Sequence, residues 1–127
     1  MKFGKKQMNL EEGLTKEWII TNGIGGFASS TILNCNTRKY HGLLIAPLTP
    51  PARRFLILSK IDESIIIDNK KYNLYTNMGK DYISDGYQYQ ESFEKRLYSY
   101  FYIQNRRCNN QKINLYGVWK KYSSNTL

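Results

Sequence analysis

Residues 21–31, TNGIGGFASST, contain the first sequence pattern that suggests a ligand-binding site. The segment from Gly23 to Ala28 satisfies the pattern G-x-G-x-x-A, which in dinucleotide-binding proteins joins a strand to a helix and cradles a pyrophosphate. The residues after Ala28 favour extended structure instead, and the acidic residue expected about 20 positions further on is absent. We therefore expect a tight glycine turn between two strands, where positive φ or close backbone approach excludes a side chain. A dinucleotide site is the alternative.

The segment NTRKYHGLL, residues 36–44, is the second dense group of polar side chains. Asn36, Arg38, Tyr40 and His41 offer planar groups with several hydrogen-bond donors, which suit a sugar or a carboxylate. In the alternative interpretation, Arg38 pairs with a structural carboxylate and His41 donates to a backbone carbonyl. A Ser-His-Asp nucleophile is not supported, because no G-x-S-x-G elbow accompanies His41.

The composition gives no support to a metal, cofactor or membrane function. His41 is the one histidine, and Cys35 and Cys108 lie far apart without C-x-x-C spacing, so we expect free thiols, no metal site and no cofactor. Reduced thiols are usual in the cytoplasm, where we place the protein. No run of about 18 apolar residues could span a membrane, and the first residues lack the apolar core of a secretory signal.

The net charge is +9, which opens the class of nucleic-acid binders. The excess is uneven: residues 1–101 hold 14 Lys and Arg with all 10 Asp and Glu, whereas residues 102–127 hold 5 Lys and Arg and no acid. The uneven charge indicates a change of composition near residue 102, whereas a nucleic-acid groove would need basic residues gathered on one surface. A small basic β domain that stacks bases on interleaved Tyr and Arg is the alternative function.

The pattern of apolar and polar residues predicts an all-β fold. We expect strands at residues 17–21, 27–33, 43–48, 71–76 and within 55–67, and a two-faced strand in 85–102. Asp68-Asn69 is the expected hairpin turn, and the polar residues 1–16 are expected to be loosely ordered. The predicted fold is an incomplete antiparallel β-sandwich over residues 17–101.

Residues 17–64 resemble the N-terminal domain of bacterial and archaeal glycogen debranching enzymes of the amylo-α-1,6-glucosidase type. That family shows W-x-x-T-N-G-x-G-G-[YF]-A-S, then N-T-R-[RK]-Y-H-G-L-L, then P-P and R, then a strand ending in Glu. The sequence carries these blocks in this order at Trp18–Ser29, Asn36–Leu44, Pro50-Pro51 with Arg54, and Glu63. Residues 74–93 also look like a family segment, L-x-T-N … G-Y-x-Y-x-E-S-F. The resemblance covers about residues 10–98, and Asn34-Cys35 departs from it, where many members have a glycine.

The resemblance implies a supersandwich-like β domain followed by a much larger (α/α)6 barrel, whose carboxylates hydrolyse the α-1,6 branch linkages of glycogen. No such barrel fits in 127 residues, so we expect an accessory domain that is inactive alone. No residue of this chain is assigned a catalytic role. Asn22, Arg38, Tyr40 and His41 are the candidate substrate-binding or domain-interface residues, which would face the barrel or the sugar-binding cleft.

Residues 102–127 form an aberrant tail in this interpretation. The resemblance stops near Tyr98, and the tail is rich in Asn and has no acid. If AT-rich codons are assumed, reading one nucleotide later from Tyr102 gives IYKIEDV, which looks like family sequence. We therefore expect a frameshifted tail on a truncated chain, with unpaired strand edges that invite aggregation.

Overall fold

The computed structural model describes residues 1–49, 52–95, 99–103 and 113–114. The elements, in chain order, are β1 (Lys2–Phe3), the 3-10 turn η1 (Lys5–Gln7), α1 (Leu10–Gly13), β2 (Glu17–Thr21), β3 (Phe27–Thr31), β4 (Gly42–Thr49), β5 (Ala52–Leu58), β6 (Ser64–Ile67), β7 (Lys70–Asn73), the 3-10 turn η2 (Gly86–Tyr89), β8 (Gln90–Lys95), β9 (Ser99–Ile103) and β10 (Ile113–Asn114). The one α-helix within the described ranges is a single turn long.

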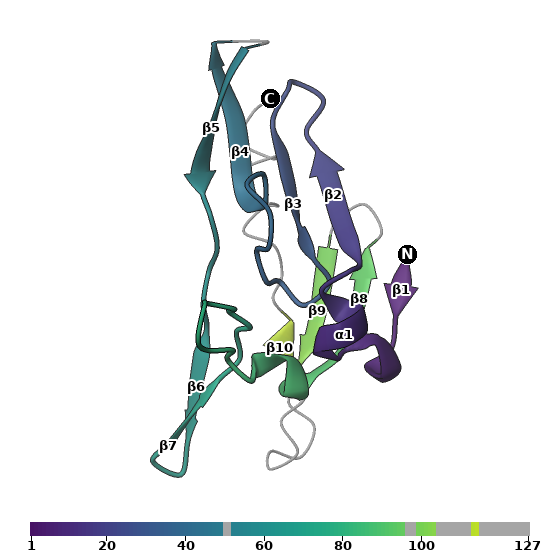
Figure 1. Cartoon of the computed structure of the whole chain (residues 1–127), viewed down its shortest axis with the longest axis vertical. Helices are drawn as coiled ribbons and strands as arrows, with labels where there is room; N and C mark the ends of the chain where they lie inside the picture. The colour runs from purple at the N-terminus through teal and green to yellow at the C-terminus, as the bar shows by residue number, and fades with distance from the viewer. Residues whose placement is uncertain (50–51, 96–98, 104–112, 115–127) are drawn as a thin grey trace.

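Antiparallel strands form three sheets (Figure 1), with strand orders β2-β3-β4-β5, β1-β8-β9-β10 and β6-β7. The expected all-β, antiparallel, sandwich-like fold is therefore confirmed. Part of the β2–β5 sheet lies over β8, and the β6–β7 hairpin extends away from both larger sheets (Figure 1). Among the described residues, no helix is long and apolar enough to cross a membrane.

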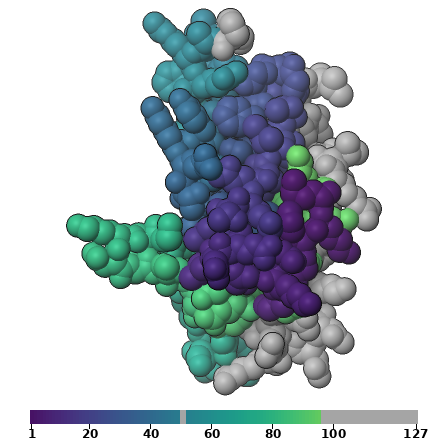
Figure 2. All heavy atoms as spheres, turned by 45° about the vertical axis from the view of Figure 1, so that its right-hand side comes forward, coloured from purple at the N-terminus to yellow at the C-terminus, as the bar shows by residue number. Residues whose placement is uncertain are grey.

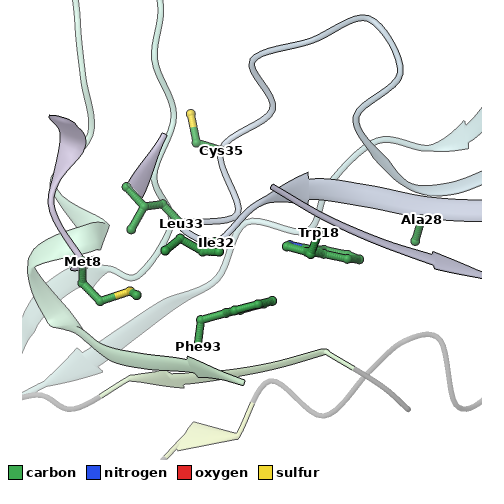
Figure 3. Close-up of a cluster of buried hydrophobic side chains, with 7 residues drawn as sticks. All are labelled: Met8, Trp18, Ala28, Ile32, Leu33, Cys35 and Phe93. Atoms are coloured by element: carbon green, nitrogen blue, oxygen red, sulfur yellow. The ribbon is translucent and has the colours of Figure 1, made fainter. Parts of the chain in front are cut away.

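The core lies between the two larger sheets (Figure 3) and is centred on Trp18 of β2 and Phe93 of β8. Their rings stack with centroids 6.2 Å apart and planes inclined by 27°. The indole Nε1 of Trp18 donates to the carbonyl of Thr31 (3.0 Å), so its polar group is satisfied inside the core. Buried Gln90 likewise donates to the carbonyl of Ile32 (2.8 Å) and joins the second sheet to the end of β3.

Residues 1–16, expected to be loosely ordered, hold β1, η1 and α1 in the structure. The Asn9 side chain accepts from the backbone N–H of Glu12 (2.8 Å), which caps the first turn of α1. Buried Met8 and half-buried Leu10 pack into the core, and β1 pairs with β8. The sequence signal for this order was weak because the segment is polar apart from a few anchoring side chains.

The region 85–102, expected to be one strand, is divided in the structure into η2, β8 and β9. Gly86 explains the first break, since a Cβ at this position would lie 2.1 Å from the carbonyl oxygen of Tyr75. The backbone therefore approaches another segment closely and curls before the strand begins. Local alternation of Tyr and polar residues resembled a strand, but this tertiary contact decides the conformation.

The other predicted turns and strands agree with the structure, except that the strands expected at 27–33 and 71–76 end at Thr31 and Asn73. Asp68 and Asn69 both have positive φ, 50° and 61°, as a two-residue hairpin turn requires. Residues 55–67 form two strands with a break at 59–63, so Glu63 lies in a connection rather than at a strand end. The expectation of a frameshifted tail at 102–127 lies outside the described residues except for the backbone of 102–103 and 113–114, and it stays a prediction.

Candidate functional site

The glycine segment is a tight turn between β2 and β3. Gly23 and Gly25 have φ of 78° and 96°, a region that side-chain-bearing residues rarely adopt. A Cβ on Gly25 would also lie 3.0 Å from Cγ of Pro47. Ala28 lies within β3 and is paired with β2, so the helix that a pyrophosphate site requires does not follow it. The prediction of a turn is confirmed, and the dinucleotide alternative is wrong.

Asn22 acts inside this turn. The side-chain Oδ1 of Asn22 accepts from the backbone N–H groups of Ile24 (3.1 Å) and Gly26 (2.9 Å). The backbone N–H of Asn22 donates to the carbonyl of Gly26 (3.1 Å). A Cβ on Gly26 would lie 2.6 Å from Nδ2 of Asn22, so the glycine leaves room for the amide. These contacts make Asn22 a cap of the turn.

His41 organises the link between β3 and β4. It is 5% exposed, and its Nδ1 accepts from the backbone N–H groups of Thr37 (3.0 Å) and Arg38 (3.3 Å). The proton of the neutral ring is therefore assigned to Nε2, which lies 3.6 Å from Oε1 of Glu17. Burial lowers the pKa of His41 below 6.5, the Glu17 carboxylate raises it, and the Arg38 guanidinium lowers it.

Glu17 connects the start of β2 to this link. Its Oε1 accepts from Nε of Arg38 at 2.5 Å, and 71% of the Arg38 side chain is exposed. The predicted pairing of Arg38 with a carboxylate is thus confirmed. The predicted donation from His41 to a backbone carbonyl is wrong, because its Nδ1 accepts backbone N–H groups and its Nε2 faces a carboxylate.

Tyr40 has a fixed backbone and an outward side chain. Its carbonyl accepts from Oγ of Ser29 on β3 (2.7 Å), whereas the residue as a whole is 62% exposed. The ammonium of Lys39, also exposed, lies 5.7 Å from the centre of the Tyr40 ring. We call residues Arg38–Tyr40 the basic turn.

The structure brings two of these four side chains together, since Arg38 and His41 meet at Glu17. Tyr40 belongs to the same turn but its side chain points outward, and Asn22 lies beyond the opposite end of β2, about 17 Å away at the usual rise per strand residue. Sequence reasoning missed Glu17. The one available signal was its position directly before Trp18, which places its side chain on the face of β2 opposite the core.

A second polar cluster surrounds Lys60, whose ammonium is nearly buried. It donates to the carbonyl of Thr76 (2.6 Å) and to Oδ1 of Asn77 (2.5 Å), and pairs with Asp62 (3.1 Å). Burial lowers the pKa of Lys60, and the hydrogen bond and charge of Asp62 oppose this shift. The three N–H groups of the Lys60 ammonium are taken up by these three acceptors, so none is left for a ligand. The cluster is therefore a structural link between the 59–63 and 74–78 segments.

The model of the glycogen debranching enzyme N terminal family matches residues 16–107, more than half of the chain. The chain belongs to this family. The match spans Glu17, the glycine turn, the basic turn and the strands from β2 through β9. It continues past Tyr98, where the resemblance was expected to stop. Searches of curated proteins and of solved structures found no match.

Proposed function

We propose that this chain is a non-catalytic N-terminal module of a glycogen debranching enzyme. Its role is accessory: the α-1,6-glucosidic bonds of glycogen are cut by an (α/α)6 catalytic domain that is not among the described residues. The observation that carries this proposal is the family match over residues 16–107. We place the parent enzyme in the cytoplasm, in keeping with the free, buried thiol of Cys35.

The chemistry of the site supports a non-catalytic role. Glycosidases that invert configuration use two carboxyl groups about 6.5–9.5 Å apart, one as acid and one as base. The site around the basic turn contributes one carboxylate, Glu17, and it is engaged by Arg38 and faces His41. One carboxylate, already paired with Arg38, does not supply both the acid and the base that this chemistry requires.

We assign Arg38 and Tyr40 to contact with the catalytic domain or the α-glucan. His41 supports this surface from inside its turn, because it is buried whereas the Arg38 and Tyr40 side chains point outward. Asn22 is exposed and caps the separate glycine turn at the other end of β2 with its Oδ1.

A debranching assay on the purified chain tests the non-catalytic assignment. The substrate is an α-1,6-branched limit dextrin. We expect that any background release of glucose stays the same when an acidic residue is changed to its amide. The four variants are Glu17→Gln, Glu63→Gln, Glu91→Gln and Glu94→Gln. Sustained turnover that is lost in one of them would overturn the proposal.

A further inference from the structure

Hydrogen bonds to buried groups fix the backbone of the basic turn, whereas its side chains are exposed. Two backbone N–H groups converge on buried His41, and the Tyr40 carbonyl is fixed to Ser29 of β3. These contacts order the backbone before any ligand arrives. A partner that binds the turn therefore does not have to order it, which lowers the entropic cost of binding.

Two of the three side chains of the turn, Arg38 and Lys39, are cationic donors, and the third, exposed Tyr40, has a hydroxyl group that both donates and accepts. Arg38 uses Nε to reach Glu17, so both terminal nitrogens of its exposed guanidinium stay available, and Lys39 adds an exposed ammonium. A glucan is uncharged, and each of its hydroxyl groups both donates and accepts. Arg and Lys cannot accept, and the nearest carboxylate, Glu17, is already engaged, so Tyr40 alone in the turn could both donate to and accept from a sugar hydroxyl. The two cations match an anion better than a neutral sugar.

The face of the β2–β5 sheet opposite the core, which adjoins the turn, carries further cationic and apolar side chains. Half-exposed Ile19 lies opposite Ser29 on that face, and Arg54 of β5 stacks over Phe27 at 5.9 Å. The four strands β2–β5 and the 36–42 link contain four cations and one acid, Glu17, in the part of the chain that the structure describes. Tyr, Arg and an apolar centre are typical of protein–protein contact surfaces.

We infer that the basic turn binds an acidic protein surface, with a carboxylate of the partner held by the two terminal nitrogens of Arg38. This inference rests on the proposed function and names the chemistry of the partner: a carboxylate-bearing face of the catalytic domain, in preference to the glucan. A planar guanidinium fixed at Nε presents its other edge for a two-point contact, which a lysine ammonium cannot reproduce.

An NMR titration of the ¹⁵N-labelled chain at low ionic strength tests the inference, with an octaglutamate peptide as the acidic probe and maltoheptaose in parallel. We expect the peptide to shift the amide signals of residues 37–41, and added salt to weaken binding because the charges are exposed. Arg38→Gln should weaken peptide binding about tenfold, and Arg38→Lys should weaken it nearly as much although the charge is kept.

Lys80→Gln is the matched control for net charge. Lys80 is exposed, lies outside the basic turn and belongs to the segment around residue 80 that projects from the surface (Figure 2). Binding by this variant should stay within about twofold of the unchanged chain. Equal weakening by Lys80→Gln, or an absence of peptide shifts at 37–41, would overturn the inference. Shifts at 37–41 with maltoheptaose alone would also overturn it, yet they would support the glucan-contact form of the proposed function, so the two failures are distinguishable.

Discussion

His41 has two ring nitrogens with different tasks. Nδ1 receives two backbone N–H groups and so shapes the basic turn, whereas Nε2 faces the carboxylate that holds Arg38. Protonation would place an N–H on Nδ1 directly against two other donors. The neutral ring is therefore the form that fits the folded chain, in agreement with the lowered pKa.

The first prediction concerns the pH dependence of stability. The pKa of His41 is lowered from 6.5 in the folded chain. Between this lowered pKa and 6.5, the unfolded chain therefore binds more protons than the folded chain. The contribution of neutral His41 to stability is fully present above about 6.5 and declines as pH falls through this window. Urea unfolding at a series of pH values measures it. The decline should be smaller in His41→Gln, and an equal decline in both chains would contradict the assignment.

The second prediction concerns Asn22. Asn22→Ala removes the acceptor of two backbone N–H groups in the glycine turn, and we expect it to lower the free energy of unfolding by about 1 kcal/mol. Asn22→Asp keeps an acceptor oxygen in the same place and should cost clearly less. Urea unfolding compares the three chains. If Asn22→Ala were as stable as the unchanged chain, the cap would have no energetic role.

At the scale of elements, β5 has the most exposed apolar surface. It is the last strand of its sheet in the described residues, and Phe55, Leu56 and Ile57 are 48%, 50% and 53% exposed. A strand edge with apolar side chains on both faces is a template for pairing with another chain. The expectation from the sequence that a partial sandwich leaves edges that invite association stays a prediction.

The third prediction follows from this edge. Ile57→Lys places a charge on β5, and we expect it to suppress concentration-dependent self-association with a change in unfolding free energy within about 0.5 kcal/mol. Ile24→Lys is the matched control, because Ile24 is also exposed but lies in the glycine turn, away from this edge. Sedimentation velocity measures both variants. Association that Ile24→Lys suppresses equally would indicate a general effect of charge.

Elements set by local residues could be predicted from the sequence. The β2–β3 turn was foreseen because positive φ at Gly23 and Gly25 is a local requirement, and Asp68-Asn69 is a local turn signal. The role of Glu17 was not foreseen, because its meeting with Arg38 and His41 depends on how the link between β3 and β4 folds back toward the start of β2. The break before β8 was missed for a similar reason, since Gly86 responds to a distant backbone segment.

At the scale of the whole molecule, two sheets share one core, and the family match covers strands of both. Phe93 joins them, since it packs on Trp18 from the second sheet (Figure 3). The basic turn and Arg54 lie on the opposite face of the first sheet, away from this core. The arrangement suits a module that is stabilised on one face and docks with the other.

A debranching assay with the catalytic domain supplied separately is the decisive test of the proposed accessory role. A family (α/α)6 domain that lacks its N-terminal module is assayed on an α-1,6-branched limit dextrin with increasing amounts of this chain. We expect a saturable rise in rate, and about tenfold more of the Arg38→Gln chain should be needed for the same effect. An unchanged rate at every concentration of folded chain, or turnover by the chain alone, would contradict that role.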